Sequence, residues 1–214
     1  MKLKIFLFPV ILTIIICNSI FPRSINKNNK IDNLMSQYED LTEFSLNMRK
    51  YKIVESIKKI NEEINLINNI LTIESFNQLK ANQNEISKLS KNQDYASIAL
   101  IAVDSYKILA LELDYTKLKI PQEVVLFDYV GFKIKSLLIQ KVIDWNNIKA
   151  TSKTTENLWD NVKVRIKNDA LKDLVSDIVL GLKNSVSTQN KNMLNFGAQM
   201  NLDAVDLLEA YFEK

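Results

Sequence analysis

Two aspartates, Asp104 and Asp128, lie within the two most apolar stretches of the chain, residues 95–113 and 122–142. A buried carboxylate costs free energy unless a cation or a hydrogen-bond donor compensates it. The same stretches contain side chains that could do so, namely Tyr106, Lys107, Tyr129 and Lys135. The pattern predicts either a polar pocket that binds a small ligand or a structural polar network, and we favour the network.

A second group of acids lies in the last residues of the chain, NLDAVDLLEAYFEK. At about 100° per residue, three of these acids share one helical stripe and the fourth lies beside it. The stripe is Asp206, Glu209 and Glu213, with Asp203 adjacent. Such oxygen ligands could bind a divalent cation, and their charge could instead attract a basic partner. The interpretation we favour is a solvated face of a docked helix.

One glycine, Gly131 in LFDYVGFK, lies inside a stretch with a helical pattern. A glycine within a helix costs about 1 kcal/mol relative to alanine. Its presence therefore predicts that another helix packs closely against this position.

Several kinds of catalytic chemistry are excluded by residues that the chain lacks. It has no histidine, and its one cysteine is Cys17. Ser-His-Asp and Cys-His nucleophile systems, ordinary zinc sites and haem attachment through C-x-x-C-H therefore cannot be built. Its three glycines do not form a P-loop or a G-x-G-x-x-G motif. We expect a protein that is not an enzyme and has no cofactor.

The N-terminal residues have the pattern of a secretory signal, because Lys2 and Lys4 precede an apolar run that ends at Cys17. The expected signal peptide is residues 1–19, which would place the protein in the periplasm or otherwise outside the cytoplasm. The alternative is an uncleaved inner-membrane anchor over residues 5–21. Lipidation of Cys17 is disfavoured because a bulky residue, Ile16, precedes it.

Removal of the signal lowers the formal charge from +3 to +1, since two lysines leave with it. This argues against a nucleic-acid partner, which would require a basic surface. A polar tether is expected over residues 20–30, followed by a helical domain over 31–214. A membrane contact is expected only if the N-terminal segment is retained.

The fold class follows from scarce glycine and proline, three of each, and from long helical periodicities. Residues 31–71 form either one helix with a stutter or two helices joined near Lys50. An all-α antiparallel bundle of about six to eight helices is expected, with the two apolar helices at its centre. A short α-helical repeat array is the alternative, since three helices begin with an aromatic residue. The further helices are predicted at 74–91, 95–113, 122–142, 144–166, 169–187 and 190–213.

Function is predicted only as a class. The leading hypothesis is an exported bacterial helical domain, non-enzymatic, that binds a partner protein or supports an envelope assembly. The alternative is a periplasmic helical bundle that binds a small molecule or a metal ion in a polar pocket around Asp104 and Asp128. The many Asn, Lys and Ile residues are typical of AT-rich bacterial coding sequences.

Overall fold

The computed structural model describes residues 21–214. The signal peptide expected over residues 1–19 and Cys17 lie outside the described residues, as does nearly all of the alternative anchor over 5–21. The described part is 84% helical and has no strands, which confirms the all-α prediction. It contains eight α-helices: α1 (Phe21–Leu46), α2 (Lys50–Glu63), α3 (Ile73–Lys91), α4 (Tyr95–Glu112), α5 (Gln122–Leu138), α6 (Trp145–Val162), α7 (Asp169–Ser187) and α8 (Lys191–Glu213). Three short 3-10 helices accompany them: η1 (Ile64–Ile67), η2 (Tyr115–Lys117) and η3 (Lys163–Arg165).

Helix starts follow the capping residues that the sequence contains. The Asp94 side chain accepts from the backbone N–H of Ser97 at the start of α4, and Asp144 does the same for α6. Such caps satisfy backbone donors that have no partner inside the helix. Of the two alternatives for residues 31–71, the structure has two helices: α1 ends at Leu46, α2 begins at Lys50, and the connecting residue Met48 has a φ of 51°.

Two local expectations are wrong. The predicted tether over 20–30 is helical from Phe21 onward, and the buried side chain of Asn28 exchanges two hydrogen bonds with the backbone of Asp114. That contact holds the first turns of α1 against a segment 86 residues away. Helix α5 ends at Leu138, four residues before the predicted end at residue 142.

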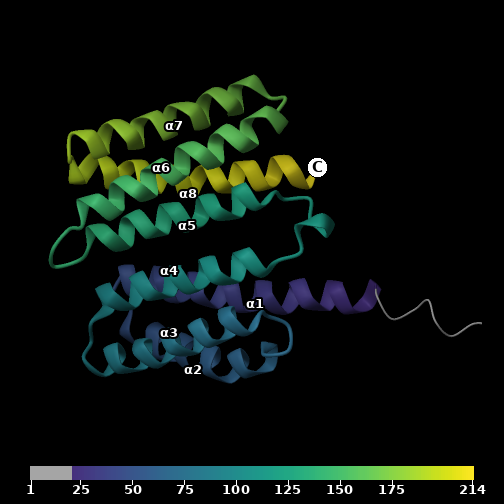
Figure 1. Cartoon of the computed structure of the whole chain (residues 1–214). Coiled ribbons are helices and arrows are strands. Elements are labelled where there is room, and N and C mark those ends of the chain that lie inside the picture. The colour runs from purple at the N-terminus through teal and green to yellow at the C-terminus, as the bar shows by residue number, and fades with distance from the viewer. Residues whose placement is uncertain (1–20) are drawn as a thin grey trace, which may run out of the picture.

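The eight helices of the described part form two groups of four with the same connectivity. In the first group, α1 packs against α2 and α4, and α3 packs against α4. In the second, α5 packs against α6 and α8, and α7 packs against α8. Figure 1 shows them stacked in order, from α2 and α3 through α1 and α4, then α5 and α8, to α6 and α7. The apolar helices α4 and α5 join the two groups, which confirms their central position.

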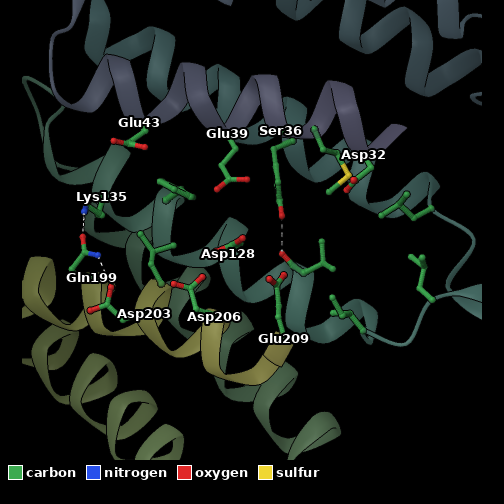
Figure 2. Close-up of a pocket in the computed structure, with 18 of the residues that line it drawn as sticks. Asp32, Ser36, Glu39, Glu43, Asp128, Lys135, Gln199, Asp203, Asp206 and Glu209 are labelled. Atoms are coloured by element: carbon green, nitrogen blue, oxygen red, sulfur yellow. Dashed lines mark hydrogen bonds between the residues drawn. The ribbon is translucent and has the colours of Figure 1, made fainter. Parts of the chain in front are cut away.

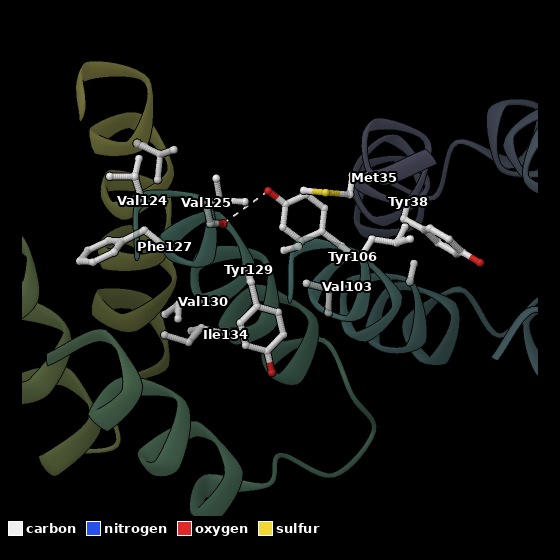
Figure 3. Packing of buried hydrophobic residues seen from close by; sticks show 14 of the residues in the cluster. Met35, Tyr38, Val103, Tyr106, Val124, Val125, Phe127, Tyr129, Val130 and Ile134 are labelled. Atoms are coloured by element: carbon white, nitrogen blue, oxygen red, sulfur yellow. Dashed lines mark hydrogen bonds between the residues drawn. The ribbon is translucent and has the colours of Figure 1, made fainter. Parts of the chain in front are cut away.

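Aromatic side chains hold the central layers together. Tyr106 of α4 is buried beside Met35 of α1, and its hydroxyl donates to the carbonyl oxygen of Val125 on α5 at 3.4 Å (Figure 3). On the other side of α5, Phe127 meets Trp159 of α6 edge to face, with 6.3 Å between ring centroids. Tyr106 therefore links the two four-helix groups at the point where they meet.

Gly131 marks the close approach of α5 and α8, as its position within a helix predicted. A Cβ atom at this position would lie 2.6 Å from Cδ2 of Leu202 and 3.1 Å from Nδ2 of Asn201. The buried Asn201 side chain in turn donates to the carbonyl oxygen of Phe127 at 2.8 Å. These contacts fix the position of α8 against α5.

Candidate functional site

A cleft of about 1000 Å³ separates α1 from α8. It exists because α1 packs on α4, α4 on α5 and α5 on α8, whereas α1 and α8 are not joined by a comparable contact. The two helices run antiparallel and form the walls. Residues of α4, α5 and the segment between these helices line the rest of the cleft. The cleft is thus a product of how the two four-helix groups meet.

Acidic side chains dominate both walls. In Figure 2 the labelled acids of α1 point across the cleft toward those of α5 and α8. On α8 the acids are three or four residues apart, so they share the face that is turned to the cleft. Eight carboxylates line the cleft in all: Asp32, Glu39 and Glu43 from α1, Asp128 from α5, and Asp203, Asp206, Glu209 and Glu213 from α8.

The three lysines that line the cleft do not form ion pairs with these eight acids. Lys117 pairs with Asp114 at 3.2 Å, and Lys119 donates to the backbone carbonyl of Glu213. Lys135 donates to Gln199, whose amide group donates to Asp203 at 2.9 Å. Among the described residues, the one salt bridge to a cleft carboxylate joins Arg49 to Glu43 at 3.9 Å. The carboxylates of the cleft therefore outnumber its lysines, and most of them have no ion-pair partner within the described part of the chain.

The carboxylates raise one another's pKa. Burial, followed by the charges of Asp40, Glu209, Glu43 and Asp206, raises the pKa of Glu39 to about 7. Burial is also the largest cause at Asp128, where the charges of Glu39, Glu209 and Asp206 hold the pKa well above its ordinary value. Each acid is thus disfavoured in its charged form by desolvation and by like charges, as expected for carboxylates that share a site.

Two smaller shifts at the walls have the same direction. Burial raises the pKa of Asp32, and burial together with Asp206 and Glu213 raises the pKa of Glu209. For Lys135 burial lowers the pKa, against the raising effect of Asp203 and Glu43. A cation that entered the cleft would oppose the like-charge contribution to these shifts by supplying an opposite charge.

Apart from Asp128, the side chains on the floor of the cleft, between the acidic walls, are mainly apolar. Met35 comes from α1, Val125 and Phe132 from α5, and Leu202 from α8. The buried ring of Tyr106 lies among them. A ligand that matches this lining combines positive charge with hydrocarbon.

The structure separates the two aspartates that were expected to share a pocket. Asp128 lines the cleft together with Tyr106 and Lys135, but Asp104 does not. Positions 104 and 106 differ by about 200° around a helix, so their side chains leave α4 on opposite sides. The structure therefore does not bring the two aspartates into one pocket.

Asp104 belongs instead to a packed contact between α4 and α5. The Lys133 ammonium group lies 2.7 Å from both carboxylate oxygens of Asp104, and the Lys133 side chain is only 7% exposed. The expected partner, Lys107, lies over the ring of Tyr129, with 4.8 Å between Nζ and the ring centroid. Burial and the charge of Asp104 raise the pKa of Tyr129. This is a structural polar network of the kind that we favoured.

The four acids at the C-terminus all line the cleft. Within the part of the chain that the structure describes, no group of three or more acidic, histidine or cysteine side chains could hold a metal ion. The metal interpretation of Asp203, Asp206, Glu209 and Glu213 therefore has no geometric support. Their charge and their place in the cleft fit the other interpretation, attraction of a basic partner.

Sequence reasoning missed the acids of α1. Asp32, Glu39 and Glu43 are separated by seven and four residues, a spacing that keeps them on one face of a helix. That spacing was a usable signal, but it does not identify α8 as the facing helix.

Comparison with known proteins gives no match, whether to a family model, to a curated protein or to a solved structure. None of the helices in residues 21–214 has both the length and the apolar character needed to cross a membrane.

Proposed function

We propose that the chain is an exported, non-enzymatic binding domain whose cleft between α1 and α8 receives a cationic segment of a partner protein. One observation carries this proposal: eight carboxylates line the cleft, and of these eight only Glu43 has a salt bridge to another described residue. Elsewhere on the described surface, acids such as Asp160 and Glu156 have lysine partners within 3.2 Å. A site that gathers like charges without neutralising them gains most from a ligand of opposite charge.

Binding is a better match than catalysis for the residues available. The chain has no histidine, and Cys17 lies outside the described residues. What remains in the cleft is a set of acids, of which Glu39 and Asp128 have raised pKa values, together with apolar side chains. Electrostatic attraction of a cation needs only the charges, whereas acid–base catalysis would also need a positioned reacting group.

A small organic cation is the second candidate ligand. It is favoured by Asp128, which lies on the floor of the cleft rather than on its walls (Figure 2). The volume of about 1000 Å³ is at the upper end of the range of small-molecule pockets, roughly 300–1,000 Å³. Both candidates predict a cationic ligand at the same carboxylates.

The test is calorimetric titration of the protein with hexalysine, with spermine and with a hexaglutamate control. We expect both cations to bind and hexaglutamate not to bind. The variant Asp206→Asn/Glu209→Gln should lose most of the affinity. The matched control is Asp173→Asn/Asp177→Asn, which removes the same charge from the exposed face of α7. Equal losses in the two variants, or no binding of either cation, would reject the proposal.

A further inference from the structure

We propose that the partner segment is a basic amphipathic α-helix that lies along the cleft, parallel to its two walls. This inference rests on the proposed function and names the kind of segment that the cleft selects. Four features of the described residues lead to it: the length of the cleft, the nature of its walls, the position of its apolar floor and the distribution of its charge.

The cleft is long rather than round. Its lining runs from Asn28 on α1 to Asn47, the residue after this helix, and from Asn195 to Glu213 on α8. At 1.5 Å per residue these spans correspond to about 27–29 Å. A single small cation would contact only part of this length, whereas a helix of about 18 residues would match it.

The walls are helices, and this decides the conformation of a bound peptide. Backbone N–H and C=O groups inside α1 and α8 are already used within each helix. The walls therefore offer side chains only, and an extended peptide could not pair its backbone with them as it would at a sheet edge. A helical peptide satisfies its own backbone groups and can lose water from one face without an unsatisfied donor or acceptor.

The floor and the charges define the two sides of such a helix. Met35, Phe132 and Leu202 would contact an apolar stripe with the helical spacing of about 3.6 residues. The acids of α1 and α8 lie on both sides of that floor, so basic residues are required on both flanks of the stripe. Groove-bound amphipathic helices are recognised in this way by their i, i+3, i+4 and i+7 anchors.

The test compares two peptides of about 18 residues with the same leucine and lysine composition. In one the leucines have helical spacing, and in the other the order is scrambled so that no apolar stripe forms. We expect the amphipathic peptide to bind at least about tenfold tighter in fluorescence anisotropy at moderate salt. Its helical circular dichroism should increase on binding, beyond the sum of the separate spectra.

Two pairs of variants separate the charge from the floor. Glu39→Gln/Asp206→Asn should weaken binding of both peptides, and Asp173→Asn/Asp177→Asn should leave it unchanged. Ile139→Ser changes a cleft residue that is 36% exposed, so the fold should be retained. It should reduce the preference for the amphipathic peptide, whereas Leu180→Ser on the exposed face of α7 should not.

The outcomes distinguish this inference from the function on which it rests. If the two peptides bound with equal affinity, or if spermine bound more tightly than either, the inference of an amphipathic helix would be rejected. The proposal of a cation-binding cleft would remain. If no cation bound, or if the binding did not depend on Asp206 and Glu209, both this inference and the proposed function would be overturned. If the amphipathic peptide bound tightly and Glu39→Gln/Asp206→Asn did not weaken its binding, the peptide would lie outside the cleft. That result would also reject the inference.

Discussion

Asp104 and Asp128 are both acids within highly apolar helices, but their environments in the structure are opposite. Asp104 faces a packed contact between α4 and α5, where Lys133 binds both of its oxygens at 2.7 Å. Asp128 faces the cleft, where its charged neighbours are Glu39, Glu209 and Asp206. One carboxylate is neutralised by the fold, and the other is surrounded by like charges.

The difference shows where the fold favours stability and where it does not. A paired carboxylate holds two helices together, whereas unpaired like charges oppose the closure of α1 on α8. Natural proteins depart from local rules of stability mainly at functional sites, where activity requires the unfavourable arrangement. The contrast between the two aspartates therefore supports a function at the cleft. It can be tested by substituting either aspartate.

The largest effect is expected from Asp104→Ala, which leaves the buried ammonium group of Lys133 without its partner. The free energy of unfolding should fall by about 2 kcal/mol, less than the 3–5 kcal/mol typical of fully buried pairs. The lower figure reflects the 42% exposure of the Asp104 side chain. Urea denaturation followed by circular dichroism measures it. The double variant Asp104→Ala/Lys133→Met should recover most of the loss, and an unchanged midpoint in the single variant would contradict a structural role.

The opposite sign is expected from Asp128→Asn, which keeps the shape of the side chain and removes a carboxylate from the cleft. At about pH 8 the variant should be more stable than the natural protein by about 1 kcal/mol, because one source of repulsion is gone. Thermal unfolding at fixed ionic strength measures the gain. If Asp128→Asn were as destabilising as Asp104→Ala, the two aspartates would be equivalent after all.

Stability should also depend on pH in a direction set by the cleft. Because the pKa of Glu39 is raised to about 7, its protonated form is favoured by folding. Its contribution to stability is complete below its ordinary pKa of 4.5 and is lost as the pH rises through about 7. The raised pKa values of Asp128 and Glu209 act in the same direction. Denaturation midpoints should therefore increase on acidification from about pH 8 to about pH 5.

Carboxylates that pair with lysines make stability depend on pH in the opposite direction, but they do so below the range of about pH 5 to 8. Hydrogen bonds and charges from Lys163 lower the pKa of Asp160, so its effect appears only below its ordinary value of 3.8. The control for the cleft is Glu39→Gln, which should reduce the slope between about pH 5 and 8. A slope that is unchanged in Glu39→Gln would show that groups elsewhere determine it.

Most of the fold could be predicted from the sequence because helix limits are largely local. Asp94 and Asp144 cap α4 and α6 with their own side chains, and the break before Lys50 follows from an interrupted apolar spacing. The start of α1 at Phe21 was not predicted, and within this helix Asn28 contacts the backbone of Asp114, 86 residues away. That contact is specified by tertiary packing and not by the composition of residues 20–30.

The site could be predicted only in separate parts. Asp128, Lys135 and the C-terminal acids were each identified, but no pattern in the sequence indicated that α1 faces α8 across a cleft. Lys107 was named among the side chains that could compensate Asp104, whereas the ammonium group that binds it comes from Lys133 of α5. Spacing along one helix predicts a shared face, and it does not predict which helix meets that face.

The smallest effect that separates the two aspartates is that of salt. Ions screen exposed charges over about 10 Å at 0.1 M and about 3 Å at 1 M, and they act much less on buried pairs. Sodium chloride should therefore stabilise the natural protein at about pH 8 by a few tenths of a kcal/mol through the cleft, and hardly affect the contact of Asp104 with Lys133. Denaturation midpoints measured across a salt series give this increment. It should shrink in Glu39→Gln/Asp206→Asn and persist in Asp173→Asn/Asp177→Asn, whose charges are removed from α7. Equal increments in both variants would mean that salt acts on the protein as a whole, and the repulsion assigned to the cleft would have no measurable part in its stability.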